Sequence, residues 1–255
     1  MALDIAVLVS VGRHPASARN RRAVLDARAL ELALNVPGAN IHLIHAGDAD
    51  EPALREYLGM GVERLSVLGV PAHADVLPVL VAHLKALRPA LVLCGAAAEQ
   101  GAGSGELPYR LAAALGMPIV PAVAGFELHG GRAQLAQALP RGRRRGVEAA
   151  LPVLLSVDRA APEPRQSAYA RAQRGQIERI AVPAAPLWQP PGEEQPARKR
   201  PKRLKLISGS GAERMRAAQG AAASAGKGQL LVQPEPAAAA QAIYDYLLSE
   251  GILRG

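Results

Sequence analysis

The sequence predicts a doubly wound α/β domain, with a mostly parallel sheet, helices on both faces of the sheet and an extended C-terminal arm. Three observations support this expectation. Short apolar runs alternate with segments of helical periodicity as far as Leu115, which is the pattern of repeated βαβ units. The apolar runs are continuous, as in strands that are buried on both faces. From about Ala160 onward prolines become frequent and the regular pattern ends, which indicates an arm.

The elements of the first part follow in βαβ order. We expect strands at 5–11, 41–45, 65–68 and 91–94, and helices at 24–34, 51–58, 75–87 and 106–115. Pro37 and Gly38 end the first of these helices, and Pro89 ends the third. The alternation therefore predicts a parallel sheet with helices on both faces.

The period changes after Leu115. Segments 119–127 and 133–138 flank Gly130 and Gly131 and are expected to form a β-hairpin, and 152–157 is a further apolar strand. A last helix is expected at 237–248. Its apolar stripe consists of Ala238, Ala242, Ile243, Tyr246 and Leu247. Such a helix either docks on another subunit or packs back on its own domain.

Composition limits the class of protein. The chain has 255 residues, of which 49% are hydrophobic and 20% charged, so one main domain with an appendage is expected. We place the domain at 1–189 and the basic, proline-rich arm at 190–255. Cys94 is the single cysteine, which excludes an internal disulfide framework and a multi-cysteine zinc site. With an acidic Asp4 near the start and no long apolar stretch, we expect a cytoplasmic location.

The basic charge is concentrated in two clusters. The net charge is +8, and Arg and Lys are grouped at 141–145 and 198–205. Neither cluster is interleaved with the aromatic residues that stack on bases. A solvated loop, or a patch that meets an acidic protein, is therefore favoured over a nucleic-acid interface.

A loop of small residues at 95–105 joins the strand at 91–94 to the helix at 106–115. Small residues let a ligand approach the backbone, and unpaired amides at a helix start favour an anion such as phosphate. The loops after 5–11 and 41–45 are expected at the same edge of the sheet, where ligands of such folds bind. The spacing matches neither a phosphate loop nor a dinucleotide fingerprint, so a plain tight connection stays open as the alternative.

Several short motifs resemble the β subunit of electron transfer flavoproteins. Residues 26–33 are similar to that family's Asp-x-x-Ala-Leu/Val-Glu-x-Ala segment, and 54–64 to its Leu-Arg-x-x-Leu-x-Met-Gly-x-x-Arg segment. Residues 91–95 resemble the strand before the family's nucleotide loop. Residues 151–157, followed by Pro164-Arg165, resemble its last core strand, and 243–252 its closing helix. The resemblance covers most of the chain and implies a Rossmann-like, adenine nucleotide alpha hydrolase-like fold.

The resemblance also implies a function. The chain would be the β subunit of a heterodimer in which an α subunit holds most of one FAD, and electrons would pass from flavin dehydrogenases to a quinone oxidoreductase of the respiratory chain. It would be an electron carrier without catalytic residues of its own. The arm would dock on the α subunit, and Pro164–Arg171 would clasp the donor dehydrogenase, with Tyr169 where the family presents an anchoring Leu.

In many family members the β subunit also buries an AMP. Matching positions would place the adenine near the first strand, the ribose beside the first helix and residue 46, and the phosphate in the loop at 98–107. The corresponding residues are Leu8, Val9, Ala23, Val24, Leu25, Asp26, Ala46, Ala98, Glu99, Gln100, Gly101, Ala102, Gly103, Ser104, Gly105, Glu106 and Leu107.

Three positions depart from the family pattern. The segment 101–107 contains one acid, Glu106, where the family loop is rich in Asp. Leu25 stands where a family aromatic approaches the flavin ring, and Ser10 stands where the family has a Lys after the first strand. These differences indicate a divergent branch with its own dehydrogenase.

Two rival functions compete with the carrier. A hydrolase needs a nucleophile with partners, but Ser104 lies between glycines outside a Gly-x-Ser-x-Gly frame. His42 and His45 fall on opposite faces of a strand and make a poor metal pair, so no metal site is assigned. A non-redox regulatory module that binds an adenine nucleotide stays open as the alternative, although such a module has no need for the arm.

Overall fold

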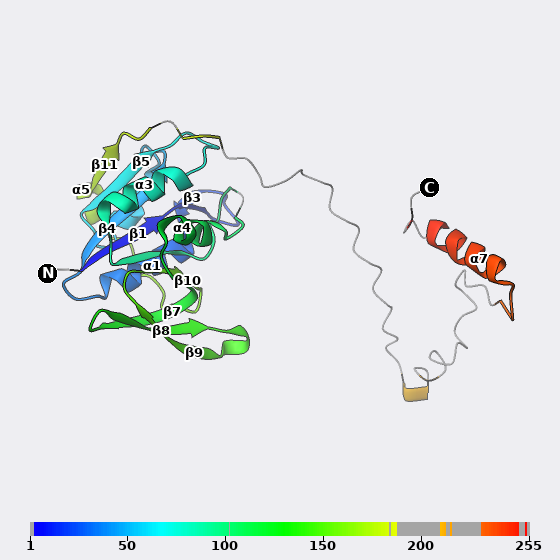
Figure 1. The fold of residues 1–255 in the computed structure, drawn as a ribbon. Coiled ribbons are helices and arrows are strands. Elements are labelled where there is room, and N and C mark those ends of the chain that lie inside the picture. Colours follow the sequence, from blue (N-terminus) through cyan, green and yellow to red (C-terminus); the bar gives the residue numbers. More distant parts are fainter. Residues whose placement is uncertain are drawn as a thin grey trace. The chain divides into compact units, whose positions relative to one another are not determined.

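The computed structural model describes residues 3–101, 103–183, 185–187, 210–212, 215, 231–249 and 253. The chain divides into a unit of residues 1–193 and a unit of residues 194–255 (Figure 1), and each is described by itself.

The first unit is built on one large sheet. Within the described residues nine strands follow the order β11-β5-β4-β1-β6-β10-β7-β8-β9. All neighbours from β11 to β7 are parallel, and β8 and β9 are added antiparallel. The bounds are β1 Asp4–Val9, β4 Asn40–Gly47, β5 Arg64–Gly69, β6 Leu91–Gly95, β7 Ile119–His129, β8 Arg132–Ala138, β9 Arg144–Ala150, β10 Val153–Val157 and β11 Gln176–Ile180. The expected doubly wound sheet is confirmed.

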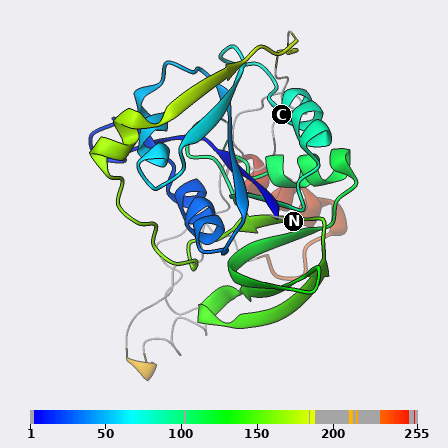
Figure 2. The same cartoon turned by 90° about the vertical axis from the view of Figure 1, so that its left-hand side faces the viewer.

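Helices cover both faces of this sheet. The helices are α1 Val24–Leu34, α2 Arg55–Leu58, α3 Leu77–Leu87 and α4 Leu107–Leu115. Figure 2 shows α1 on one side of the sheet and α3 and α4 on the other. The expected helix at 51–58 begins as a 3₁₀ turn, Pro52–Leu54, and continues as α2.

The core consists of two apolar layers, one on each face of the sheet. Along β1, Ile5, Val7 and Val9 pack with α1 and α2, whereas Ala6 and Leu8 pack with α3 and α4. Successive side chains of a strand point to opposite faces, so a central strand with two covered faces needs apolar residues at every position. This requirement explains the continuous apolar runs of the sequence.

Four strands, β2, β3, β9 and β11, were not expected from the sequence. Val11–Arg13 and Asn20–Arg22 form a small antiparallel pair, β2 and β3, directly after β1. The expected strand at 5–11 therefore ends at Val9. The basic cluster at 141–145, interpreted above as a loop or patch, contributes Arg144 and Arg145 to the exposed strand β9. Charged residues suit an outer strand because they oppose pairing with other chains.

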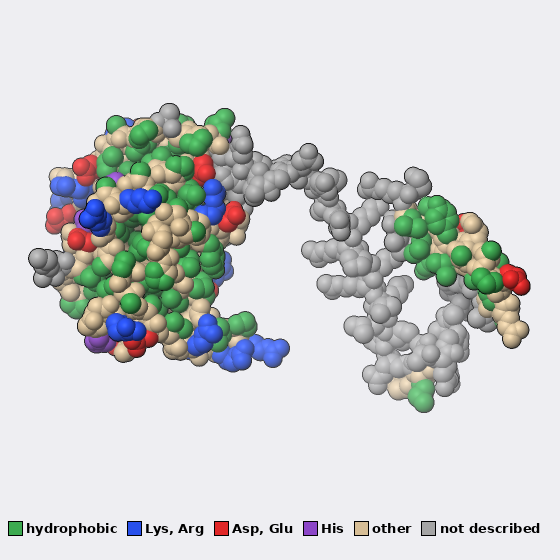
Figure 3. All heavy atoms as spheres, in the orientation of Figure 1, with side chains coloured by type: hydrophobic (Ala, Val, Ile, Leu, Met, Phe, Trp, Pro, Cys, Tyr) green, Lys and Arg blue, Asp and Glu red, His purple; other side chains and the backbone are tan. Residues whose placement is uncertain are grey.

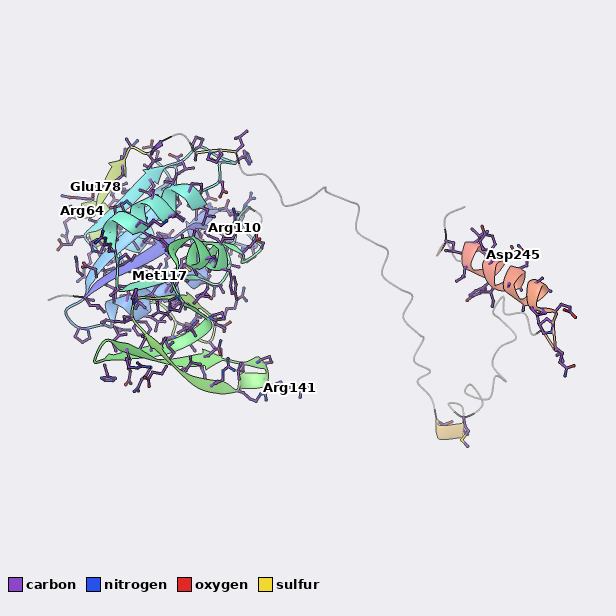
Figure 4. All side chains as sticks on the ribbon, viewed as in Figure 1. Arg64, Arg110, Met117, Arg141, Glu178 and Asp245 are labelled. Carbon is purple, nitrogen blue, oxygen red and sulfur yellow. The ribbon has the colours of Figure 1, made fainter. Side chains whose placement is uncertain are left out.

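The prediction that regular structure ends near Ala160 was wrong for the segment 169–180. Tyr169–Arg174 forms helix α5, and β11 pairs in parallel with β5 at the edge of the sheet. Arg64 and Glu178 lie on these two neighbouring strands, 4.0 Å apart (Figure 4). The sequence did not predict β11 because its residues are mostly polar. An edge strand buries few of its side chains and so needs few apolar residues.

Basic side chains gather where β8 and β9 are joined. Figure 3 shows Lys and Arg side chains at this end of the unit, and Arg141 is labelled there in Figure 4. Arg144 Nη2 donates to the Ala160 carbonyl at 3.2 Å, and Arg145 Nη2 to Gln137 Oε1 at 2.6 Å. The cluster is thus partly tied to its own domain.

In the second unit the described helix is α7, Pro236–Ser249, close to the expected 237–248. None of its residues is buried, and Ile243 is 62% exposed. Figure 3 shows apolar side chains on the visible face of α7. The basic cluster at 198–205 lies outside the described residues. Among the described helices, none is both long enough and apolar enough to span a membrane.

Candidate functional site

The carboxyl ends of β1 and β6 form the point where the winding of the sheet reverses. From β1 the chain passes through α1 to β4 on one side, and it reaches β6 on the other side of β1 only after β5 and α3. We call the region between these two strand ends the switch point. Ligands of doubly wound folds bind at such a position, so the polar contacts there decide what the domain can hold.

Asp26, in the first turn of α1, joins three segments at the switch point. Its Oδ2 accepts hydrogen bonds from the amide and the hydroxyl of Ser10, at 2.8 and 2.5 Å, and its Oδ1 accepts one from the Gly95 amide at 2.9 Å. A Cβ atom on Gly95 would lie 2.4 Å from Oδ1, so only glycine fits there. Burial raises the pKa of Asp26 to about 6, although the three hydrogen bonds oppose this shift.

Tyr57, from α2, forms a second tie between the same segments. Its buried hydroxyl donates to the Ser10 carbonyl at 2.7 Å and accepts a hydrogen bond from the Ala23 amide at 2.7 Å. Burial also raises the pKa of this phenol well above its ordinary value. The end of β1 and the start of α1 are therefore both fastened to one side chain.

Glu99, in the loop after β6, reaches back to the start of α1. Its Oε1 accepts a hydrogen bond from the Val24 amide at 2.7 Å, and its Oε2 accepts from the Arg13 amide at 3.1 Å. Arg21 Nη2 donates to the same Oε2 at 3.2 Å. A helix start with an arginine beside it is the donor set that proteins offer to phosphate, and here a carboxylate of the chain itself takes these donors.

Gln100 ties the same loop to the small β2–β3 pair. Its amide group donates to the Gly12 carbonyl at 3.2 Å and to Asn20 Oδ1 at 3.3 Å. A Cβ atom on Gly12 would lie 2.7 Å from both Ala23 Cα and Glu99 Oε2. Close approach of backbone to backbone is thus the reason for a glycine at this position.

The rest of the loop, 103–107, folds on itself before α4. Gly103 and Gly105 have positive φ, and a Cβ atom on Gly105 would lie 3.0 Å from the Ala96 carbonyl oxygen. Ser104 Oγ accepts from the Glu106 amide at 3.3 Å, which is a local contact at the helix start. Arg110 of α4, labelled in Figure 4, pairs with Asp75 at 3.1 Å.

The structure brings together part of the residue set predicted from the sequence. Val24, Asp26, Glu99 and Gln100 meet around the ends of β1 and β6, and Leu25 lies beside Gly95. Leu8 and Val9 are buried at the end of β1, and Ala46 stands at the end of β4. Ala98 and Gly101 belong to the connecting loop. Ala102 lies outside the described residues.

Several contributors were absent from the predicted set, and three of them act through side chains that donate hydrogen bonds or join two segments. Ser10, Arg21 and Tyr57 supply hydrogen bonds at the switch point. Each acts on a partner at least 16 positions away in sequence, so no local motif marks them. The composition did not single out Tyr57 either, because the burial of this tyrosine is seen only in the structure.

A second polar centre fastens the segment 164–171. The Arg165 guanidinium and amide donate to the Glu31 carboxylate, with Nε–Oε2 at 2.8 Å, Nη2–Oε1 at 2.9 Å and N–Oε2 at 3.0 Å. These hydrogen bonds hold the pKa of Glu31 below its ordinary value. The Ala168 amide donates to the Gly59 carbonyl at 3.0 Å. The next residue, Tyr169, is 78% exposed, so a fixed backbone displays an aromatic side chain.

Other reactive side chains are held in structural roles. Burial raises the pKa of the Cys94 thiol far above its ordinary value, and a buried thiol of this kind is a poor nucleophile. His45 is buried, with Nδ1 at 2.9 Å from the Val9 carbonyl oxygen. Among the described residues, no group of three or more His, Cys, Asp and Glu is arranged to hold a metal ion.

Two comparisons with known proteins bear on this arrangement. Residues 18–185 match the family model described as electron transfer flavoprotein domain. A protein of Chromohalobacter salexigens, named electron transfer flavoprotein subunit beta, is 47% identical to this chain over 263 residues, which cover 99% of this chain and 97% of that protein. The similarity therefore extends through the sheet, the switch point and the arm.

Proposed function

The chain belongs to the electron transfer flavoprotein β-subunit family, and on that premise we propose that it pairs with an α-type subunit that holds most of one FAD. The heterodimer carries electrons from flavin dehydrogenases to a quinone oxidoreductase of the respiratory chain. FAD supplies the redox chemistry when it is bound, and the polypeptide supplies position and electrostatics. In this proposal no side chain of the chain acts as an acid, a base or a nucleophile.

The extent of the similarity carries the proposal. It covers 99% of this chain and so includes the arm and α7. A self-contained nucleotide-binding module has no use for such an arm, whereas an obligate heterodimer does. Exposed apolar residues on an amphipathic helix are a common means of binding a partner. Ile243 and Tyr246, which are exposed on α7, are our candidates for contacts with the α subunit.

The segment 164–171 is our candidate for the contact with the donor dehydrogenase. Arg165 and Ala168 hold its backbone against Glu31 and Gly59, and Tyr169 projects outward. An aromatic anchor on a backbone that is already ordered loses little entropy when it binds. The donor would then recognise the electron carrier through this ridge, while the sheet serves as a rigid support.

Co-expression with an α-type subunit tests the heterodimer. We expect a yellow complex that retains FAD through purification. A chain that ends before Pro196 should lose assembly yet keep the secondary structure of the first unit in circular dichroism. Within α7, Ile243→Arg should weaken assembly, whereas Gln241→Arg adds the same charge on the polar side of the helix and should not. A colourless monomer, or a truncated chain that still co-purifies with the flavin subunit, contradicts the proposal.

A further inference from the structure

The donors around Glu99 form a place for an anion that the chain fills by itself. The Val24 and Arg13 amides point their N–H groups at the carboxylate, at 2.7 and 3.1 Å. The Arg21 guanidinium approaches it from the β3 strand at 3.2 Å. Amides at the start of an eleven-residue helix carry partial positive charge. An anion is therefore favoured at this point, and Glu99 supplies one.

The carboxylate is packed into this position. Glu99 belongs to an exposed loop, yet its side chain is only 23% exposed. Its Oε2 lies so close to Gly12 that a methyl group there would be 2.7 Å away. The next residue, Gln100, holds the loop down through the Gly12 carbonyl. A phosphate at the same amides would have to displace the Glu99 side chain.

Arg21 retains a donor that Glu99 does not use. Its Nε atom is buried and has no hydrogen-bond partner. A carboxylate offers two acceptor oxygens, whereas a phosphate monoester offers three and carries more negative charge. Three donors, the Val24 and Arg13 amides and Arg21 Nη2, thus surround one carboxylate, and a phosphate would meet the same donors. This donor set is what an anion site would show if a carboxylate had taken the place of a phosphate.

We propose that Glu99 is the built-in anion of the switch point, in the place of a nucleotide phosphate, and that it excludes AMP from the start of α1. The inference rests on the proposed function, because the β-subunit resemblance is what implies AMP in this domain. The loop after β6 stabilises α1 through its own carboxylate and needs no bound nucleotide.

Nucleotide binding to the full-length chain tests the inference. In the first measurement, protein purified without added nucleotide is denatured and the released AMP is quantified by chromatography. In the second, refolded or untreated protein is titrated with AMP and with inorganic phosphate by calorimetry. Wild type should release no stoichiometric AMP. Glu99→Ala should bind AMP at least roughly tenfold more tightly than wild type, because the amides and Arg21 are then free for phosphate oxygens. Adding Arg21→Ala to this variant should remove the gain.

Glu63→Ala is the matched control, because it removes one negative charge from an exposed position outside the predicted nucleotide site. It should bind AMP as weakly as wild type. Equal gains in the two alanine variants would mean that only net charge matters, and stoichiometric AMP from wild type would mean that Glu99 excludes nothing. Either result overturns the inference.

Two further measurements cover the cases in which Glu99→Ala does not fold or the proposed function fails. If Glu99→Ala fails to fold, Glu99→Gln retains the size of the side chain, and AMP should raise its melting temperature but not that of wild type. No such rise counts against the inference. The flavin content of the complex with the α-type subunit is measured separately. A colourless complex rejects the proposed function, whereas a yellow complex that also releases AMP rejects only the role of Glu99.

Discussion

Replacement of Asp26 by Asn should change how the stability of the domain depends on pH. Asp26 is fully buried, and burial raises its pKa to about 6 from an ordinary value of 3.8, with a smaller contribution from Glu99 in the same direction. Because the pKa of this carboxyl group is higher in the folded chain than in the unfolded chain, the folded chain binds more protons at a pH between the two values. The contribution of this carboxyl group to stability is therefore complete below pH 3.8 and is lost as the pH rises through about 6.

The magnitude follows from these two values. One pKa unit corresponds to about 1.4 kcal/mol, so the difference between the two pKa values of Asp26 corresponds to about 3 kcal/mol in the free energy of unfolding. Between pH 7 and pH 4.5 the folded carboxyl takes up its proton while the unfolded one stays mostly ionised, which adds about 2 kcal/mol to the free energy of unfolding. The amide of the Asp26→Asn variant cannot ionise, so the variant lacks this gain. The amide group of the variant faces the Ser10 donors, which lowers the free energy of unfolding by the same amount at every pH. This constant loss does not alter how the free energy of unfolding changes with pH.

The assay is urea unfolding of the full-length chain at several pH values from 4.5 to 7. The quantity of interest is the difference in unfolding free energy between wild type and Asp26→Asn. It should increase by about 2 kcal/mol as the pH falls. The control is Glu106→Gln, which removes one carboxyl group at an exposed position. It shows how much the difference in unfolding free energy changes with pH when the buried carboxyl group is kept. A difference that stays constant, or that shrinks toward acid pH, means that the hydrogen bonds from Ser10 and Gly95 outweigh burial and that the reasoning fails.

Two other substitutions test the remaining polar contacts. Tyr57→Phe should cost about 1–3 kcal/mol in denaturant unfolding, because the Ser10 carbonyl and the Ala23 amide lose their shared partner in a buried place. Tyr109→Phe, at an exposed position, should change stability by less than about 0.5 kcal/mol, and equal losses would refute the role of Tyr57. Arg165→Ala should speed amide hydrogen exchange in the segment 164–171 and leave exchange in β1 unchanged. Exchange that is unaltered in the segment would show that Ala168 alone holds it.

The central fold could be predicted from local patterns because burial on two faces leaves a mark on the sequence. Continuous apolar runs identified β1, β4, β5 and β6, and helical periodicity with a proline-glycine stop identified α1. The segments that were missed are β2, β3, β9 and β11, which are polar, short or at an edge. Their strand conformation depends on a neighbour that is distant in sequence, and no local propensity reveals the neighbour.

The polar contacts of the candidate site were harder to predict for the same reason. Asp26 and Glu99 were singled out by the resemblance, as residues around a nucleotide. Their contacts with Ser10 and with the Val24 amide became visible only in the structure. A hydrogen bond between segments tens of residues apart leaves no period in the sequence. The sequence therefore indicated where the switch point lies, but not that carboxylates of the chain itself accept hydrogen bonds from the Ser10, Val24 and Gly95 amides.

These hydrogen bonds within the chain have a consequence for how the protein works. Asp26, Tyr57 and Glu99 together tie the end of β1, the start of α1 and the loop after β6. Hydrogen bonds between buried polar groups rigidify the segments that they join. A region fastened by its own side chains suits a fixed support better than a site that opens and closes around a ligand. The segment with Tyr169 and the apolar residues of α7 are exposed, and these are the surfaces that we propose for partner recognition. On this argument, changes at the switch point should alter stability and nucleotide binding, whereas changes at the ridge and at α7 should alter electron transfer and assembly.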